Sequence, residues 1–211
     1  MKKMLAIALV LAAGTASAAV SSTKHNMNSY SGSQTQGGTT ANATGGTGDV
    51  CYYCHAAHNT LVGAAPLWAR NNPVTTSYVT YSSSTISKNI NGIMDPVSLA
   101  CLSCHDGTIA VNQTIKGRVG GLATDKFMLG NATAKIGPNL SNDHPVSIAW
   151  AGTGYAGLTA TMPAAFQPYN IGGSPGLACA SCHEPHGTSF SKFLRADPNS
   201  GSFCVSCHAS K

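Results

Sequence analysis

The chain has 211 residues, of which only 9% are charged and 43% are hydrophobic, and its formal net charge is +5. Because soluble proteins carry about 25% charged residues, uncharged polar groups must form most of this surface. No basic patch is present in the sequence, which argues against nucleic acid as a partner.

Residues 1–18 have the pattern of a secretory signal peptide. Lys2 and Lys3 precede an apolar run, and the small residues of Ala16-Ser17-Ala18 are suited to cleavage before residue 19. The apolar run is too short to span a bilayer, and no later stretch is long enough. The sequence therefore predicts a secreted protein, extracellular or at the outer cell surface, without a transmembrane segment. The alternative location is the periplasm.

Residues 19–50 are predicted to form a flexible N-terminal arm, because glycine is interspersed there with serine, threonine and asparagine. His25 lies near the start of this arm. Its two interpretations are a solvated arm residue and a ligand that the arm carries to a distant site.

Four C-x-x-C-H motifs begin at Cys51, Cys101, Cys179 and Cys204, and together they use all eight cysteines. This is the attachment pattern of c-type haem, in which two sulfurs form thioethers to the porphyrin and the histidine becomes the proximal iron ligand. The pattern predicts four haem c groups. The predicted thioether residues are Cys51, Cys54, Cys101, Cys104, Cys179, Cys182, Cys204 and Cys207, and the predicted proximal ligands are His55, His105, His183 and His208.

Structural zinc sites are the main alternative, since paired C-x-x-C units also bind zinc. A histidine directly follows all four units, which zinc binding does not require and haem attachment does. Disulfides are disfavoured because every thiol falls into this one pattern.

Between the motifs, few regular elements are predicted. Residues 78–81 alternate in the manner of a short strand, and Asp95 with Pro96 indicates the N-cap and first position of a helix that runs into the second motif. The interval 106–178 contains His144, which Pro145 biases toward extended backbone, and its glycines and prolines after residue 151 indicate loops. The predicted fold class is a mostly irregular, coil-rich chain with few short helices and at most short strands, wrapped around four haems.

An internal echo links the two ends of the tetrahaem domain predicted for residues 51–211. The sequence His-x-x-His-x-Thr begins at His55 and again at His183, and it precedes Leu67-Trp68-Ala69-Arg70 in the first copy and Phe193-Leu194-Arg195 in the second. Each doubled motif is followed by a single one, so the domain is predicted to hold two haem pairs, at 51–105 and 179–208. Glu184 before Pro185 disfavours a helix in the second copy.

The histidines outside the motifs equal the haems in number, so each is a candidate distal ligand. They are His25, His58, His144 and His186. Methionine is the competing axial ligand, and the mature region offers Met27, Met94, Met128 and Met162. The histidine count leaves no position for methionine to fill.

His58 and His186 each follow a proximal histidine by three residues, a spacing that keeps them on the same side of the haem as that histidine. Each is therefore predicted to serve the other haem of its own pair. The resulting assignments are His58 to the haem on Cys101/Cys104, His186 to that on Cys204/Cys207, His144 to that on Cys51/Cys54, and His25 to that on Cys179/Cys182.

The chain resembles the doubled C-x-x-C-H multihaem cytochromes, through residues 101–108, 142–146 and 179–188. Within that family, the haem count, the length and the early Lys24-His25 are similar to secreted four-haem cytochromes that polymerise. The resemblance covers most of residues 20–208. It implies bis-histidine ligation, stacked and T-shaped haem pairs, and a filament that conducts electrons outside the cell, with one ligand crossing between subunits.

Bis-histidine ligation fills both axial positions, which favours electron transfer over catalysis. We therefore expect an electron-transfer protein and not an enzyme, most simply a head-to-tail homopolymer in which His25 reaches a haem of the neighbouring subunit. Its other partners would be redox proteins or extracellular electron acceptors. The alternatives are a soluble periplasmic tetrahaem shuttle and an electron-transfer subunit of an oxidoreductase.

Overall fold

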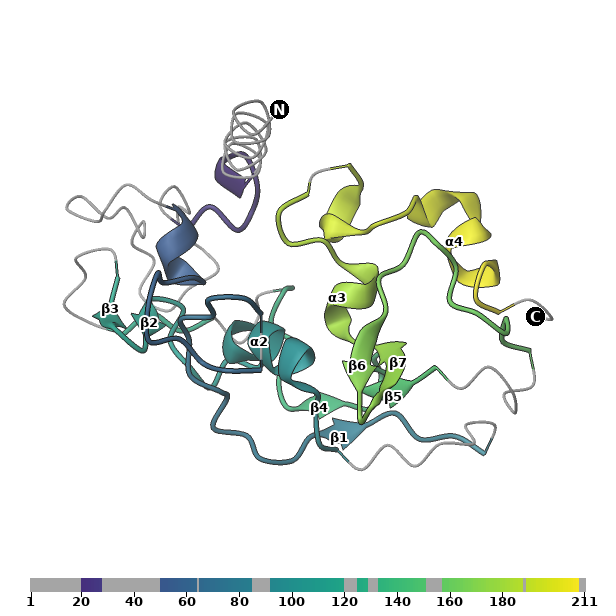
Figure 1. The fold of residues 1–211 in the computed structure, drawn as a ribbon, viewed down its shortest axis with the longest axis horizontal. Coiled ribbons are helices and arrows are strands. Elements are labelled where there is room, and N and C mark those ends of the chain that lie inside the picture. The colour runs from purple at the N-terminus through teal and green to yellow at the C-terminus, as the bar shows by residue number, and fades with distance from the viewer. Residues whose placement is uncertain are drawn as a thin grey trace, which may run out of the picture.

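The computed structural model describes residues 20–27, 50–63, 65–84, 92–119, 125–128, 133–150, 157–187 and 189–208 (Figure 1). The predicted signal peptide and most of the predicted arm lie outside these residues. Within the arm, the described part is 20–27 together with Val50, so His25 can be placed.

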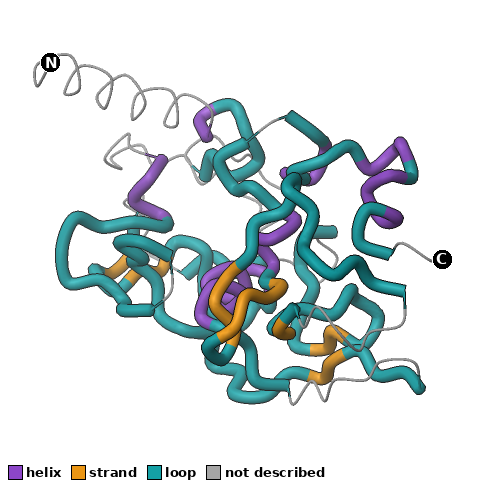
Figure 2. The backbone as a smooth tube through the Cα atoms, turned by 45° about the vertical axis from the view of Figure 1, so that its right-hand side comes forward, coloured by secondary structure: helices purple, strands orange, loops and turns teal. Residues whose placement is uncertain are grey.

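Loops make up most of the described chain, as Figure 2 shows. The helices are η1 (Val50–Tyr53), α2 (Pro96–His105), α3 (Cys179–Cys182), η2 (Ser191–Phe193), η3 (Pro198–Ser200) and α4 (Ser202–Val205). The strands are β1 (Val79–Thr80), β2 (Gln113–Thr114), β3 (Gly117–Arg118), β4 (Asn139–Leu140), β5 (Ile148–Ala149), β6 (Tyr169–Ile171) and β7 (Ser174–Leu177). The coil-rich class with short elements is confirmed.

Helix α2 is the longest described helix, and it begins where the sequence predicts. The Asp95 carboxylate accepts hydrogen bonds from the backbone N–H groups of Val97 and Ser98, both at 2.9 Å, and Pro96 occupies the first turn. Leu102 and Ser103 on this helix are fully buried. Figure 1 places α2 in the middle of the molecule.

Three small sheets connect segments that are distant in sequence. β1 pairs in parallel with β4, and β2 pairs with β3 in a hairpin. The third sheet has the order β5-β7-β6 and is antiparallel throughout. The predicted strand at 78–81 is present as the two residues of β1, whereas β6 and β7 of the three-stranded sheet fall in a region predicted to be loops. β7 ends two residues before Cys179 and so fixes the entry to the third motif.

The hydrophobic core lies between α2 and the β1–β4 pair. It consists of Tyr78, Met94, Leu102 and Leu140, with Leu99 and Val146 packed against it. The Tyr78 hydroxyl donates to the Asp106 carboxylate at 2.8 Å, which ties this core to the residue after His105. A core of this size is small for a chain of 211 residues.

Candidate haem-attachment sites

Each C-x-x-C-H motif lies on a short helix or just beyond its end. The first motif overlaps η1, and the second forms the last turns of α2. Helix α3 covers the first four residues of the third motif, and the fourth motif begins within α4. One helical turn separates the two cysteines of a motif, so both thiols project from the same side. All eight thiols are free of disulfides, as thioether formation requires.

The four motifs follow one another in space in their chain order. Burial raises the pKa of the Cys54 thiol to about 12, and the nearby Cys104 thiol adds to the rise. A hydrogen bond with Cys179 raises the pKa of Cys101, which links the second and third motifs. Burial raises the pKa of Cys182 to about 11, with a further contribution from Cys207. Successive sites are therefore neighbours, from η1 through α2 and α3 to α4, and we call this series the row.

Three of the four motif histidines have their Nδ1 atom fixed by a backbone carbonyl. His55 Nδ1 lies 2.8 Å from the oxygen of Pro66, His105 Nδ1 lies 2.7 Å from that of Ala134, and His183 Nδ1 lies 2.8 Å from that of Lys192. A carbonyl only accepts, so Nδ1 carries the proton and Nε2 keeps its lone pair. This is the tautomer that a proximal iron ligand needs.

Six of the eight histidine rings face one another in pairs. The ring centroids are 6.3 Å apart for His25 and His105, 6.2 Å for His55 and His186, and 6.2 Å for His144 and His208. Metal–nitrogen bonds to histidine are about 2 Å long and the ring centre lies about 1 Å further back, so two rings on opposite sides of one metal ion are roughly 6 Å apart. The spacing therefore fits bis-histidine ligation of an iron.

These pairs differ from the distal assignments that the sequence suggested. His25 faces His105 of its own chain and not His183 of a neighbour, His186 faces His55, and His144 faces His208. The prediction assumed that each doubled motif serves its own half. In the fold, α3 packs on α2, and the turn at Glu184–Gly187, closed by a 3.0 Å hydrogen bond between these residues, directs His186 toward the first motif.

The three distal partners are also oriented by hydrogen bonds at Nδ1. His25 Nδ1 lies 3.1 Å from the carbonyl oxygen of Pro185, and the His25 ring stacks on Phe193 at 4.3 Å. His144 Nδ1 lies 3.0 Å from the carbonyl oxygen of Pro145. His186 Nδ1 lies 3.1 Å from the Glu184 carboxylate.

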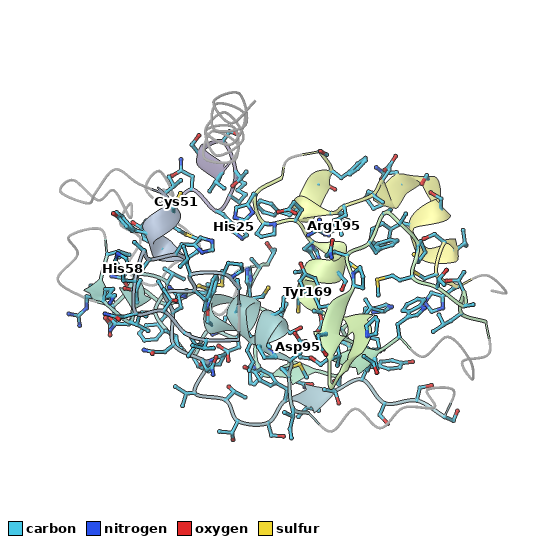
Figure 3. All side chains as sticks on the ribbon, viewed as in Figure 1. His25, Cys51, His58, Asp95, Tyr169 and Arg195 are labelled. Carbon is cyan, nitrogen blue, oxygen red and sulfur yellow. The ribbon has the colours of Figure 1, made fainter. Side chains whose placement is uncertain are left out.

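His58 and His183 do not form a fourth pair within the described chain. The His58 ring is exposed and makes no ring contact or hydrogen bond with the described residues. Figure 3 shows His58 on the side of the molecule that holds β2 and β3, whereas His25 lies between Cys51 and Arg195. His183 lies near His25 and His105, because its charge lowers the pKa of both, after the larger effect of burial.

The internal echo is a true structural repeat. Ala56 N donates to Leu67 O at 3.0 Å, and Glu184 N donates to Phe193 O at 2.7 Å. Both acceptors, Leu67 and Phe193, have positive φ angles, of 55° and 60°. A second pair of bonds also recurs, since Ala69 N donates to Cys54 O at 2.8 Å and Arg195 N donates to Cys182 O at 2.9 Å. The repeat holds the loop that follows each doubled motif against the motif itself.

Residues 173–211 match the family model for the doubled CXXCH motif. The matched segment contains the third and fourth motifs, and the match supports a multihaem c-type cytochrome with covalently bound haem that takes part in electron transfer. No curated protein matches the chain.

The described residues contain neither a cluster of metal-binding side chains nor a membrane-spanning helix. No group of three or more histidine, cysteine, aspartate or glutamate side chains in these residues could hold a metal ion. No helix there is long and apolar enough to cross a membrane.

Proposed function

We propose that the protein is an exported tetrahaem c-type cytochrome in which the four motifs bind haem covalently and the eight histidines serve as axial ligands. Bound haem would supply a one-electron carrier at each position along the row. The observation that carries the proposal is the set of three facing ring pairs, at 6.2–6.3 Å, in which Nδ1 is occupied by an oxygen acceptor in at least one ring of each pair.

The protein's own residues hold and shield the carriers. Backbone carbonyls that follow the first three motifs fix their histidine rings, and Phe193 covers the His25 ring. Both axial positions are filled by this scheme, so the site favours electron transfer without a substrate-binding position.

We further propose that copies assemble head to tail into an extracellular filament. His186 of the second doubled motif faces His55 of the first doubled motif within one chain. His58 stands in the first doubled motif at the position that His186 has in the second, and the repeat predicts that it faces the His183 of another copy. A contact of this kind joins two different surfaces, and it propagates into a fibre when its rotation does not close into a ring.

Two matched histidine variants test the assembly. His58→Ala is expected to leave four attached haems, one of them without a distal histidine, and to yield separate subunits in place of filaments under electron microscopy. His25→Ala also removes one distal histidine but within a chain, so its filaments should form normally while its spectrum gains a high-spin component.

Measurements on the wild-type protein test the haem count, the axial ligands and the filament. Denaturing mass spectrometry should show four haem additions, and the absorbance spectrum should be low-spin throughout. Separate wild-type subunits at all concentrations would favour a soluble shuttle, and a methionine–iron charge-transfer band would contradict bis-histidine ligation. Normal filaments of His58→Ala would show that His58 is not the ligand that crosses the contact.

A further inference from the structure

Arg70 is a fully buried cation, with 0% of its surface exposed. Its guanidinium has five N–H donors, and all five are used. Nε donates to Ser103 Oγ at 3.0 Å, one terminal nitrogen donates to the carbonyls of Tyr53 at 3.4 Å and Val111 at 2.9 Å, and the other donates to those of Ser103 at 3.1 Å and Ala110 at 2.9 Å.

Every acceptor of Arg70 is electrically neutral. A guanidinium is a positively charged group, and no carboxylate among the described residues forms an ion pair with that of Arg70. The buried carboxylate nearest along α2, that of Asp106, instead accepts hydrogen bonds from Tyr78 and Thr108. The carbonyls near the end of α2 offset part of the charge, but no donor remains free for a haem propionate.

The charge lies between the first two attachment motifs. Tyr53 directly precedes Cys54, and Ser103 directly precedes Cys104, so the hydrogen bonds of Arg70 join the two motifs from the inside.

The arginine of the second copy, Arg195, lies one position earlier in the repeat, where the first copy has Ala69, and its surroundings differ. Arg195 Nε donates to the Ala180 carbonyl at 2.9 Å, and a terminal nitrogen forms an ion pair with the Glu184 carboxylate at 2.9 Å. The Arg195 side chain is also 20% exposed. Its charge is therefore neutralised by a partner and partly screened by solvent.

We propose that Arg70 is a redox-tuning residue that raises the reduction potential of the haems on either side of it, and makes the haem on Cys101/Cys104 the one of highest potential. Adding an electron makes a site more negative, and a fixed buried cation nearby stabilises that state. The inference rests on the proposed function.

The haem on Cys101/Cys104 is expected to have a higher reduction potential than the haem on Cys51/Cys54, because the hydrogen-bond partners of their histidines differ. His105 and His25 both contact neutral carbonyls, of Ala134 and Pro185. At the Cys51/Cys54 position, His186 instead contacts the Glu184 carboxylate. This contact makes the imidazole a stronger electron-pair donor to iron, which lowers the reduction potential of that haem.

Charge and hydrogen bonding can be separated by substitution in the holoprotein. Arg70→Gln removes the charge, Arg70→Lys keeps it, and Arg195→Gln removes a charge that is ion-paired and partly exposed. Potentials are measured by optical redox titration, and haem content is measured by denaturing mass spectrometry.

Arg70→Gln is expected to shift at least one reduction equilibrium tenfold toward the oxidised form, which is about 59 mV for one electron. Arg70→Lys should stay within about threefold of wild type, and Arg195→Gln should shift less than Arg70→Gln. A purely structural role would destabilise Arg70→Gln and Arg70→Lys alike without moving the potentials according to charge, and that result would overturn the inference.

If Arg70→Gln does not acquire its haems, the wild-type protein can test the inference. Stepwise reduction followed by nuclear magnetic resonance should show the haem on Cys101/Cys104 reduced first, and its reduction after the haem on Cys204/Cys207 would overturn the inference. Four haems with unchanged potentials in Arg70→Gln would refute the role of Arg70 alone, whereas fewer than four haems in the wild type would refute the proposed function itself.

Discussion

At the scale of single residues, the identity of a histidine matters less than the atom to which its Nδ1 donates. The motif spacing identifies His55, His105 and His183 as candidate ligands, but their orientation depends on carbonyls at Pro66, Ala134 and Lys192. Those carbonyls lie 9 to 29 residues away along the chain and come from loops. No sequence rule links a ligand to such a partner, so the chemistry could be predicted and the geometry could not.

Asp95→Ala tests the residue that begins α2. The substitution removes the cap bonds to Val97 and Ser98 and the 2.6 Å bond from the Ser147 hydroxyl. We expect a loss of about 1–2 kcal/mol in the free energy of unfolding, measured by chemical denaturation with far-ultraviolet circular dichroism. Asp95→Asn is the control, because asparagine caps equally well and should cost about 0.5 kcal/mol or less. Equal losses for both variants would show that the cap is not the source of stability.

At the scale of elements, α2 was predictable and the β5-β7-β6 sheet was not. Asp95 and Pro96 form a local signal, and the helix needs little else to begin. The strands have only two to four residues and depend on pairing across the chain. Gly172 and Gly173, at φ of 60° and 89°, form the turn between β6 and β7, and a glycine pair of this kind is a hairpin signal that could have revealed these two strands.

Gly176→Ala tests how closely this sheet is packed. A Cβ atom at this position would meet the carbonyl oxygen of Ile148 and would lie 2.9 Å from the Cα of Ala149, both in β5. We expect destabilisation of about 1–3 kcal/mol, measured as a lower midpoint of thermal unfolding. Ser174→Ala, at the exposed first residue of β7, should change the midpoint little. An unchanged midpoint in Gly176→Ala would mean that β5 is free to move away.

At the scale of the whole molecule, residues from both halves of the chain contribute to the same candidate haem sites. The ring pair of His55 with His186 crosses between the halves, and Pro185 and Phe193 of the second half hold His25. A hydrogen bond between Cys101 and Cys179 links the second motif to the third. The repeat in the sequence could be recognised, but not the way its copies dock, because a three-residue offset excludes one iron and does not select another. The ring pairs differ from the predicted distal assignments for this reason.

Removal of whole attachment motifs should show which part of the row supports the fold. Cys101→Ala with Cys104→Ala empties the site on α2, which buries Leu102 and Ser103, and is expected to leave little folded protein. Cys204→Ala with Cys207→Ala empties the site at α4, where no helix residue is buried, and should yield a folded three-haem protein. Yield and thermal unfolding report the difference, and equal behaviour of the two double variants would contradict a central role for α2.

The contact of His25 with Pro185 and Phe193 has a consequence for the order in which the protein matures. A ribosome delivers the chain from its N-terminus, so this ring is made early, yet its supports are made more than 150 residues later. The partner of the His55 ring, His186, is also made more than 100 residues after it. The supports of His25 and the His55–His186 pair therefore cannot form until nearly the whole polypeptide has been made. Assembly is therefore a late, concerted event, and a chain that stops short of residue 186 would lack both contacts even though its first two motifs are intact.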